Sequence, residues 1–238
     1  MDSITFSGVG KRYRKLWALR DVDAAFRPGE VVMVIGPNGS GKTTFIKCLL
    51  GLVRPTSGAI HVNGERIGAD PAYRHHIGYM PQISQFPPAL TIGQLLDMMR
   101  DVRGLSPERT DDGLVEDLGL SAQLGKRLGT LSGGTMQKVS AVLAFRSAPG
   151  ILVMDEPTAG LDPLSARTVL GRAAAVRERG GTVLITSHLM EEVETLADRV
   201  AYLQDGTLRF LLPLREILAR TGTDRLSAAL PLMLADPR

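Results

Sequence analysis

The apolar positions along the chain follow two different periods, which predict strands in some regions and helices in others. Five apolar residues, most of them β-branched, occupy positions 31–35 and are typical of a strand that is buried on both faces. Ile4 and Phe6 alternate with polar neighbours instead, which predicts a strand with one exposed face. Three further runs of mainly apolar residues also indicate buried strands: 77–80, 151–154 and 182–186.

Helical periodicity dominates the middle of the chain, from about Pro87 to Ala148. Turn residues between strand-like segments predict hairpins at 59–67 and 200–210, on either side of this region. The last residues, 211–238, again have a helical pattern with an apolar face. The order of these elements predicts an α/β fold with antiparallel strands near the N-terminus and an inserted helical region.

Composition and charge add limits to this picture. The 238 residues carry a net charge of +3, and the basic residues are scattered except at 11–15, KRYRK. This cluster is either a solvated face, which we favour, or a patch for nucleic acid or lipid. The single cysteine, Cys48, provides no disulfide framework, which suits a reducing compartment. We find no signal-peptide pattern and no apolar run of the ~18 residues that span a bilayer, so a membrane role would require a partner.

A glycine-rich loop follows the predicted strand at 31–35 and carries the strongest chemical signal. In VVMVIGPNGSGKTT the glycines let backbone N–H groups turn inward around an anion, which the next helix also faces with its N-terminus. Lys42 can reach the β- and γ-phosphates of a nucleotide, and the Thr43 hydroxyl can coordinate Mg²⁺. A glycine-rich turn that binds nothing is the alternative, which the complete pattern disfavours. The predicted nucleotide-binding residues here are Gly36, Pro37, Asn38, Gly39, Ser40, Gly41, Lys42, Thr43 and Thr44.

A second predicted anion site begins at residue 131, where LSGGTMQK precedes a helical run. The Ser132 hydroxyl and the backbone N–H groups of Gly133 and Gly134 would lie at the N-terminus of that helix, a position that favours anions. Because one phosphate loop is already present, the second site requires an explanation.

Acidic and imidazole side chains follow two of the predicted buried strands. Asp155 is placed to hold Mg²⁺, directly or through water, and Glu156 can orient and polarise an attacking water. Two acids in a solvated turn are the alternative. His188 follows the strand at 182–186, where it is either a surface histidine or a ligand for the γ-phosphate; beside the phosphate loop we expect the second role.

Taken together, these motifs resemble those of the ATP-binding cassette (ABC) ATPases. GPNGSGKTT is similar to the Walker A loop, LSGG to the signature, ILVMDE to the Walker B strand with its glutamate, and AGLD, which ends at Asp162, to the D-loop. Gln82 and His188 fall at the Q-loop and switch-histidine positions. Tyr13, which we expect in a basic loop after the first strand, falls at the position that stacks on adenine.

The resemblance implies a fold and an arrangement of two chains. It implies a RecA-like P-loop NTPase core over residues 3–210, with an antiparallel β subdomain, an inserted α-helical subdomain at about 87–148 and a helical tail at 211–238. In this family two cassettes pack head to tail. Ser132 and Gly134 of one chain would therefore close over the ATP that the partner's Lys42 holds.

The resemblance further implies ATP hydrolysis with Mg²⁺. Glu156 would activate water, His188 would contact the γ-phosphate, and Asp162 would belong to the catalytic group. Gln82 would join the catalytic group and link Mg²⁺ to a transport partner, so the implied metal ligands are Thr43, Gln82 and Asp155. The expected partners are an integral membrane transporter subunit and a second copy of the chain or a homologous ATPase subunit. The protein would lie peripherally on the cytoplasmic face of the membrane, and we expect no nucleic acid partner.

Two signature residues depart from the family pattern. Thr135 stands where Gln or Glu is usual, and Lys138 stands where arginine is common. The shorter Thr135 side chain is expected to lose one polar contact across the interface, about 1 kcal/mol. The segment 77–104, together with LSGGTMQK, resembles cassettes that accompany the maturation of nitrous oxide reductase, a copper-handling export system.

Other functions are open at this stage. A non-transport ABC ATPase of DNA repair or translation is one, although the long coiled coil or second cassette of such proteins is not found in this sequence. A small-molecule kinase would leave the LSGG segment unexplained. We expect Phe86 to be an exposed aromatic. With the prolines at 87–88 it forms either a rigid turn or part of a groove that receives a helix of the membrane subunit.

Overall fold

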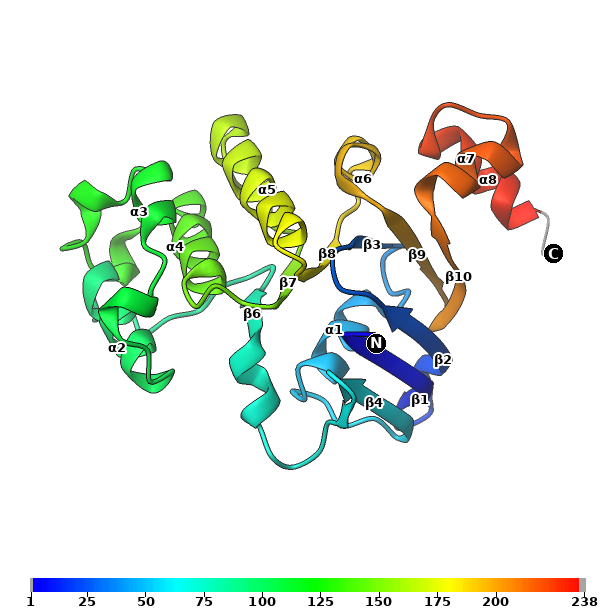
Figure 1. Ribbon diagram of the computed structural model, residues 1–238, viewed down its shortest axis with the longest axis horizontal. Coiled ribbons are helices and arrows are strands. Elements are labelled where there is room, and N and C mark those ends of the chain that lie inside the picture. The colour runs from blue at the N-terminus through cyan, green and yellow to red at the C-terminus, as the bar shows by residue number, and fades with distance from the viewer. Residues whose placement is uncertain (1, 236–238) are drawn as a thin grey trace.

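Two β-sheets form the centre of the computed structural model, which describes residues 2–235 (Figure 1). The first sheet is antiparallel, in the order β2-β1-β4-β5, with strands β1 (Ile4–Tyr13), β2 (Leu16–Phe26), β4 (Ser57–Val62) and β5 (Glu65–Arg66). The second has the order β10-β9-β3-β8-β7-β6. Its strands are β3 (Val31–Ile35), β6 (Ile77–Met80), β7 (Ile151–Asp155), β8 (Thr182–Thr186), β9 (Arg199–Gln204) and β10 (Thr207–Pro213). They run parallel except for β10, which is antiparallel to β9.

Three groups of helices accompany the six-stranded sheet. The helices α1 (Lys42–Leu49), α5 (Pro163–Glu178) and α6 (Met190–Leu196) follow β3, β7 and β8. The inserted region contains α2 (Ile92–Val102), α3 (Gly113–Asp117) and α4 (Gly133–Phe145), which lie at the β6 side in Figure 1. The last two helices, α7 (Leu214–Thr221) and α8 (Leu226–Ala235), follow β10 at the opposite side. The inserted helices and the C-terminal helices therefore lie at opposite edges of the sheet.

The strand β3 is buried on both faces because it lies between two apolar clusters. Val32 and Val34 point into a cluster shared with the antiparallel sheet and α1, whereas Met33 and Ile35 point into a cluster shared with α4 and α5. In the first cluster the rings of Phe6 and Phe45 stack with centroids 4.1 Å apart, and Phe26 packs edge-on against both. Burial on both faces explains the continuous apolar run before the glycine-rich loop.

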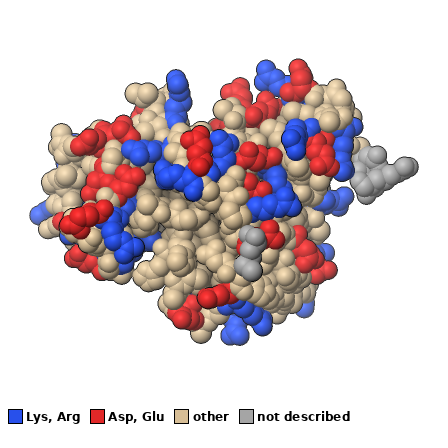
Figure 2. All heavy atoms as spheres, viewed as in Figure 1, with Lys and Arg blue, Asp and Glu red and all other residues tan. Residues whose placement is uncertain are grey.

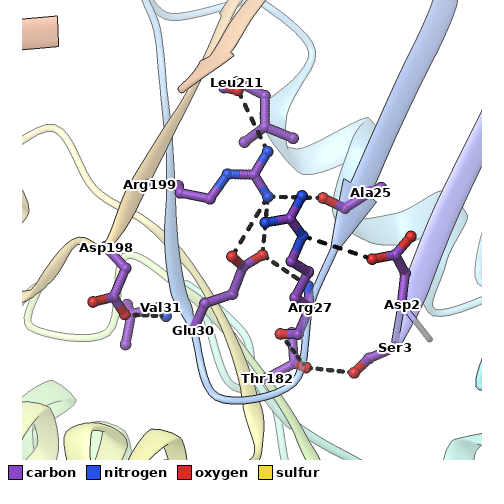
Figure 3. A network of polar contacts seen from close by, with 10 residues as sticks. All are labelled: Asp2, Ser3, Ala25, Arg27, Glu30, Val31, Thr182, Asp198, Arg199 and Leu211. Atoms are coloured by element: carbon purple, nitrogen blue, oxygen red, sulfur yellow. Dashed lines mark hydrogen bonds and ion pairs between the residues drawn. The ribbon is translucent and has the colours of Figure 1, made fainter. Parts of the chain in front are cut away.

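Polar contacts fix the start of β3 relative to β9 (Figure 3). Arg199 Nη1 lies 3.1 Å from Glu30 Oε1 and donates to the Ala25 carbonyl at 3.0 Å. The backbone nitrogen of Val31 donates to Asp198 Oδ2 at 2.8 Å. Because the Glu30 and Arg199 side chains are only 10% and 17% exposed, this pair contributes mainly by satisfying each other's charge and fixing the register of β3.

The structure confirms the predicted α/β fold and corrects three local predictions. Tyr13 pairs with Leu16 as the last residue of β1 and does not lie in a loop. The strand β10 continues to Pro213, because 211–213 pair with β9, so the helices of the predicted tail begin at Leu214. Phe86 is half-buried against the helical side of the core and is not an exposed aromatic. Residues 236–238 of the predicted tail lie outside the described residues, and the proposed division of the chain at 210 stays a prediction.

Within residues 2–235, none of the helices combines the length and the apolar character that crossing a membrane requires. Basic and acidic side chains are interspersed over the face in Figure 2, around a largely uncharged area in its middle. In the cluster at 11–15, Lys11 donates to the carbonyl of Arg54, and Arg12 lies over the Trp17 ring at 5.6 Å. Part of this basic cluster is therefore engaged within the chain.

Candidate functional site

The loop between β3 and α1 requires glycine at two positions for steric reasons. Gly36 and Gly41 have φ angles of 149° and 107°. A Cβ atom would lie 2.0 Å from the Leu203 carbonyl oxygen at Gly36, and 2.4 Å from the Ala18 carbonyl oxygen at Gly41. The loop thus packs directly on neighbouring backbone and leads into α1, whose N-terminus has no side-chain cap and can therefore face an anion.

Lys42 is the first residue of α1, and its ammonium group lies within the loop. Its Nζ donates to the carbonyls of Gly36 at 2.7 Å and Pro37 at 3.1 Å. Burial lowers the pKa of Lys42, and the negative charges of Glu156 and Asp155 partly oppose this shift. The buried Ser40 hydroxyl has no hydrogen-bond partner among the described residues. The loop therefore contains the partly buried ammonium group of Lys42 and a Ser40 hydroxyl without a partner among the described residues. A phosphate bound in the loop would satisfy both groups.

Asp155 is the last residue of β7 and is only 4% exposed. Burial raises its pKa, whereas a hydrogen bond from Thr186 and the charge of Lys42 act in the opposite direction. Within residues 2–235 no group of three or more metal-binding His, Cys, Asp or Glu side chains occurs. One carboxylate, the exposed Thr43 hydroxyl and nucleotide phosphates are a donor set that suits Mg²⁺, which keeps water and phosphate ligands.

Glu156 lies directly after β7 with a φ angle of 51°, in the left-handed region that a residue with a Cβ adopts at a cost. Its backbone nitrogen donates to the Thr186 carbonyl at 3.1 Å. Its carboxylate oxygen Oε2 accepts a hydrogen bond from Gln82 Nε2 at 3.1 Å and lies 3.4 Å from His188 Nδ1. The structure therefore brings together Gln82, Glu156 and His188, three residues from separate loops.

Sequence reasoning did not identify Thr186 as part of this site. Thr186 is the last residue of β8 and is completely buried. Its hydroxyl donates to Asp155 Oδ1 at 2.5 Å and accepts from the backbone nitrogen of Glu156 at 3.0 Å. The one available signal was a polar residue at the end of an apolar strand, next to His188.

The second predicted anion site is the N-terminus of α4. The Ser132 hydroxyl caps this helix, because its Oγ accepts from the backbone nitrogen of Thr135 at 3.3 Å and lies 2.9 Å from Thr135 Oγ1. Ser132 and Gly133 are exposed. A Cβ atom on Gly134 would lie 2.7 Å from the carbonyl of Gly160, so the helix N-terminus packs closely on the loop before α5.

Among the described residues, the Asp162 side chain makes its hydrogen bonds and ion pair outside the group of Gln82, Glu156 and His188. Its carboxylate caps α5 by accepting from the backbone nitrogen and hydroxyl of Ser165 at 2.9 and 2.6 Å. These bonds, together with Lys138 at 2.9 Å, hold the pKa of Asp162 well below its ordinary value. The recorded contacts of Asp162 are thus with Ser165 and Lys138, and they link α4 to α5.

Tyr13 and Ser132 lie on different parts of the molecule. Tyr13 ends β1 in the antiparallel sheet, is 44% exposed and has Lys11 Nζ 4.9 Å from its ring centroid.

The helix α4 packs against β6, the edge strand, whereas Lys42 follows β3. Since β7 and β8 separate these two strands, β3 and β6 are about 14 Å apart at ~4.8 Å per strand. Within one chain, the phosphate loop and the N-terminus of α4 therefore form two separate sites.

Comparison with known proteins places these features in a family context. Residues 19–159 match the family model described as "ABC transporter". The chain is 34% identical to the Nod factor export ATP-binding protein I of Burkholderia orbicola over 207 residues, 85% of this chain and 68% of that protein. It is 33% identical to the linearmycin resistance ATP-binding protein LnrL of Bacillus subtilis over 220 residues, 91% and 71% of the two chains.

Solved structures give the same context. The structure of an ATP binding subunit of an ABC transporter matches with a TM-score of 0.91 and 30% identity, over 97% of this chain and 99% of that chain. A dimeric bacterial ABC transporter cassette matches with a TM-score of 0.80 and 25% identity, over 89% and 99% of the two chains. The RecA-like core that the sequence predicted is therefore confirmed.

Proposed function

Because the chain belongs to the ABC transporter family of ATP-hydrolysing subunits, we propose that it powers export through a separate membrane subunit as a head-to-tail dimer. In this dimer each ATP is held between the phosphate loop of one copy and the α4 N-terminus of the other. A homologous ATPase subunit in place of the second copy would form the same two sites.

The observation that carries this proposal is the separation of the two anion-binding features within one chain. The loop at 36–41 and Ser132 cannot bind one nucleotide in the same chain, because β8 and β7 lie between β3 and the α4-bearing edge of the sheet. A second copy, rotated by a half-turn, would place its α4 over the first copy's loop. The exposed Ser132 and Gly133 are then explained as contacts across the interface.

We assign the residues the following roles. The loop residues 36–44 and Lys42 bind the ATP phosphates, and Tyr13 stacks on adenine. Thr43 and Asp155, with Gln82, would hold a Mg²⁺ ion, which would neutralise charge on the phosphates. Glu156 acts as the base that orients water, while His188 contacts the γ-phosphate, and Asp162 joins the group through the loop before α5.

The membrane subunit would contact the surface beside Gln82. Ile83 is 74% exposed there, next to the exposed prolines at 87–88, whereas Phe86 is turned toward the core. An exposed isoleucine beside prolines suits a groove that receives an apolar helix end. Through this contact the chain would lie peripherally on the cytoplasmic face of the membrane.

The two relatives described above are named for Nod factor export and linearmycin resistance, which supports export as the direction of transport. Their names do not concern copper. The narrower assignment to nitrous oxide reductase maturation therefore depends only on the resemblance of residues 77–104 and the LSGGTMQK segment. Genes for a copper enzyme beside this one would support it, and a different gene neighbourhood would remove it.

A disulfide experiment tests the dimer. Asn38→Cys and Gly133→Cys place thiols on exposed positions of the two anion sites, and a Cβ on Gly133 meets no atom within 4 Å. In a Glu156→Gln background, ATP is expected to drive a disulfide between two molecules. The control pair is Gly68→Cys with Gly133→Cys, because Gly68 also has open space but lies after β5. The native Cys48 is buried with its pKa raised to about 11, so it does not compete.

Failure of the Asn38 and Gly133 pair to join separate molecules at saturating ATP would overturn the dimer. Co-expression with membrane proteins of the same gene cluster tests the transport role. We expect the chain to co-purify with an integral membrane subunit. If it instead binds only ribosomes or nucleic acid, the transport role is wrong.

A further inference from the structure

A carboxylate outside the proposed catalytic group connects the two loops that carry Glu156 and His188. Glu192, in the first turn of α6, accepts a hydrogen bond from Thr158 Oγ1 at 2.5 Å through Oε1 and from Ser187 Oγ at 2.7 Å through Oε2. Thr158 lies two residues after Glu156, and Ser187 directly precedes His188. Thr158, Ser187 and Glu192 all lie outside the proposed catalytic group.

Together with the contact between His188 and Glu156, these two hydrogen bonds form a closed ring that includes both proposed catalytic residues. From Glu156 the chain runs to Thr158, whose hydroxyl bonds to Glu192. The other oxygen of Glu192 bonds to Ser187, and His188 returns to Glu156 through the 3.4 Å contact between Nδ1 and Oε2. A ring of this kind fixes the distance between the loops that follow β7 and β8, in addition to the backbone bond from Glu156 to Thr186 at the end of β8.

The local geometry indicates that Glu156 and His188 both need the support of this ring. Glu156 has a φ angle of 51°, a conformation that persists only where surrounding contacts determine it. His188, in contrast, is 63% exposed, and among residues 2–235 its side chain contacts only Glu156 as a polar partner. Ser187 is 3% exposed and its Oγ also accepts from the Leu189 nitrogen at 3.1 Å, which fixes the direction of its proton toward Glu192.

The partners of Glu192 are hydroxyl groups and not cations. The ion pairs among the described residues do not include Glu192. A carboxylate has two acceptor oxygens in a fixed fork, so it can receive both hydroxyl protons at once and hold both loops. Its neighbour Glu191 is exposed and makes no side-chain contact recorded among the described residues.

We propose that Glu192 is a positioning residue for ATP hydrolysis, whose carboxylate holds Glu156 and His188 at working distance by clamping Thr158 and Ser187. This inference rests on the proposed function, because it assigns Glu192 to the same reaction. Glu192 touches neither nucleotide nor water in this role. It acts through the two loops.

The test compares Glu192→Ala, Glu192→Gln and the matched control Glu191→Ala in steady-state ATPase assays. Alanine removes both loop contacts, so kcat is expected to fall about 10- to 100-fold while the KM for ATP changes less than about twofold. Glutamine keeps the fork: its amide oxygen can accept from Ser187, and the Thr158 hydroxyl can reverse to accept from its amide nitrogen, so kcat is expected to recover to within about threefold of the native value. Glu191→Ala is expected to match the native protein.

A double-mutant cycle separates positioning from a merely structural role. Because Glu192 holds His188 as well as Glu156, adding Glu192→Ala to His188→Ala is expected to lower kcat by a smaller factor than Glu192→Ala does alone. Native kcat in Glu192→Ala, or a full additional loss in the His188→Ala background, would overturn the proposal. Thermal unfolding of each variant is measured alongside. If Glu192→Ala does not fold, Glu192→Gln takes its place: a Glu192→Gln variant that folds like the native protein but has lost its activity would also contradict the positioning role.

The disulfide assay distinguishes this inference from the proposed function. With Glu156→Gln, ATP should join Asn38→Cys to Gly133→Cys whether or not Glu192→Ala is present. If the disulfide is absent without the Glu192 change, the proposed dimer is wrong. If only Glu192→Ala abolishes it, the dimer stands and Glu192 serves nucleotide binding, so the positioning role is wrong.

Discussion

The hydroxyl of Thr186 lies 2.5 Å from the Oδ1 atom of Asp155, inside a strand pair that is closed to solvent. The same Oγ1 accepts from the backbone nitrogen of Glu156 at 3.0 Å. One buried hydroxyl thus orients the proposed metal ligand and the backbone of the proposed base. Mutation of residues that orient a metal ligand in this way typically lowers metal affinity or activity by about 10- to 100-fold.

We expect Thr186→Val to weaken the apparent affinity of the ATPase for Mg²⁺. Valine has the shape of threonine but leaves Asp155 without its hydrogen bond, and loss of that bond raises the pKa of Asp155 further. The Mg²⁺ concentration for half-maximal activity is expected to rise about 10-fold or more. Thr186→Ser keeps the hydroxyl and serves as the control; an unchanged Mg²⁺ titration for the valine variant would contradict the role of Thr186.

Asp155→Asn should stabilise the protein in Mg²⁺-free solution at neutral pH. Burial raises the pKa of Asp155 in the folded state, so the folded protein binds a proton more tightly than the unfolded chain. Stability is therefore lost as the pH rises from the pKa of Asp155 in the unfolded chain to its higher pKa in the folded protein. Asparagine removes the buried charge, so its advantage in the free energy of unfolding should shrink as the pH is lowered and Asp155 becomes protonated. Urea unfolding at several pH values measures this, and an advantage that grows at low pH would contradict it.

Glu156→Gln is expected to retain ATP binding and lower kcat by at least about 100-fold. The amide keeps the size of the side chain but cannot accept a proton from the attacking water. Equilibrium binding of a fluorescent ATP analogue and single-turnover hydrolysis separate the two effects. Hydrolysis near the native rate would remove Glu156 from the role of base.

Lys42→Ala is expected to weaken ATP binding about 10- to 100-fold, because the phosphate charge loses a charge-assisted hydrogen bond of ~1.5–3 kcal/mol. The control is Lys47→Ala, an exposed lysine near the end of the same helix. Isothermal titration with ATP compares the two variants. Native affinity in Lys42→Ala would contradict the assignment of the loop.

Thr135→Val should weaken the ATP-dependent dimer by about fivefold, whereas Thr135→Ser should not. The Thr135 hydroxyl lies 2.9 Å from Ser132 Oγ, and either oxygen can donate in this pair; when Thr135 donates, its hydroxyl and its backbone nitrogen together occupy the acceptor sites of Ser132. The Ser132 proton is then free to point outward to a phosphate, an effect of about 1 kcal/mol. Analytical ultracentrifugation in the Glu156→Gln background measures the dissociation constant, and equal values for the two variants would show that Thr135 only caps α4.

Much of the site could be predicted from the sequence because its parts depend on local backbone chemistry. The run at 31–35 had to be a strand buried on both faces, and the glycines at 36 and 41 had to adopt angles that side chains disfavour. A helix cap at Ser132 and an acid at the end of β7 are likewise decided by neighbours in sequence. Such features follow from a few consecutive residues, whatever the rest of the chain does.

Only the tertiary structure decided which of these parts meet. Gln82, Glu156 and His188 come from three loops, and their contacts follow from the order β3-β8-β7-β6, which no local pattern encodes. The same holds for Thr186 and Glu192, whose side chains matter because adjacent parallel strands end at the same edge of the sheet. The sequence determined the chemistry of each segment, whereas long-range packing determined their distances, since side-chain contacts between remote segments exist only after the sheet has formed.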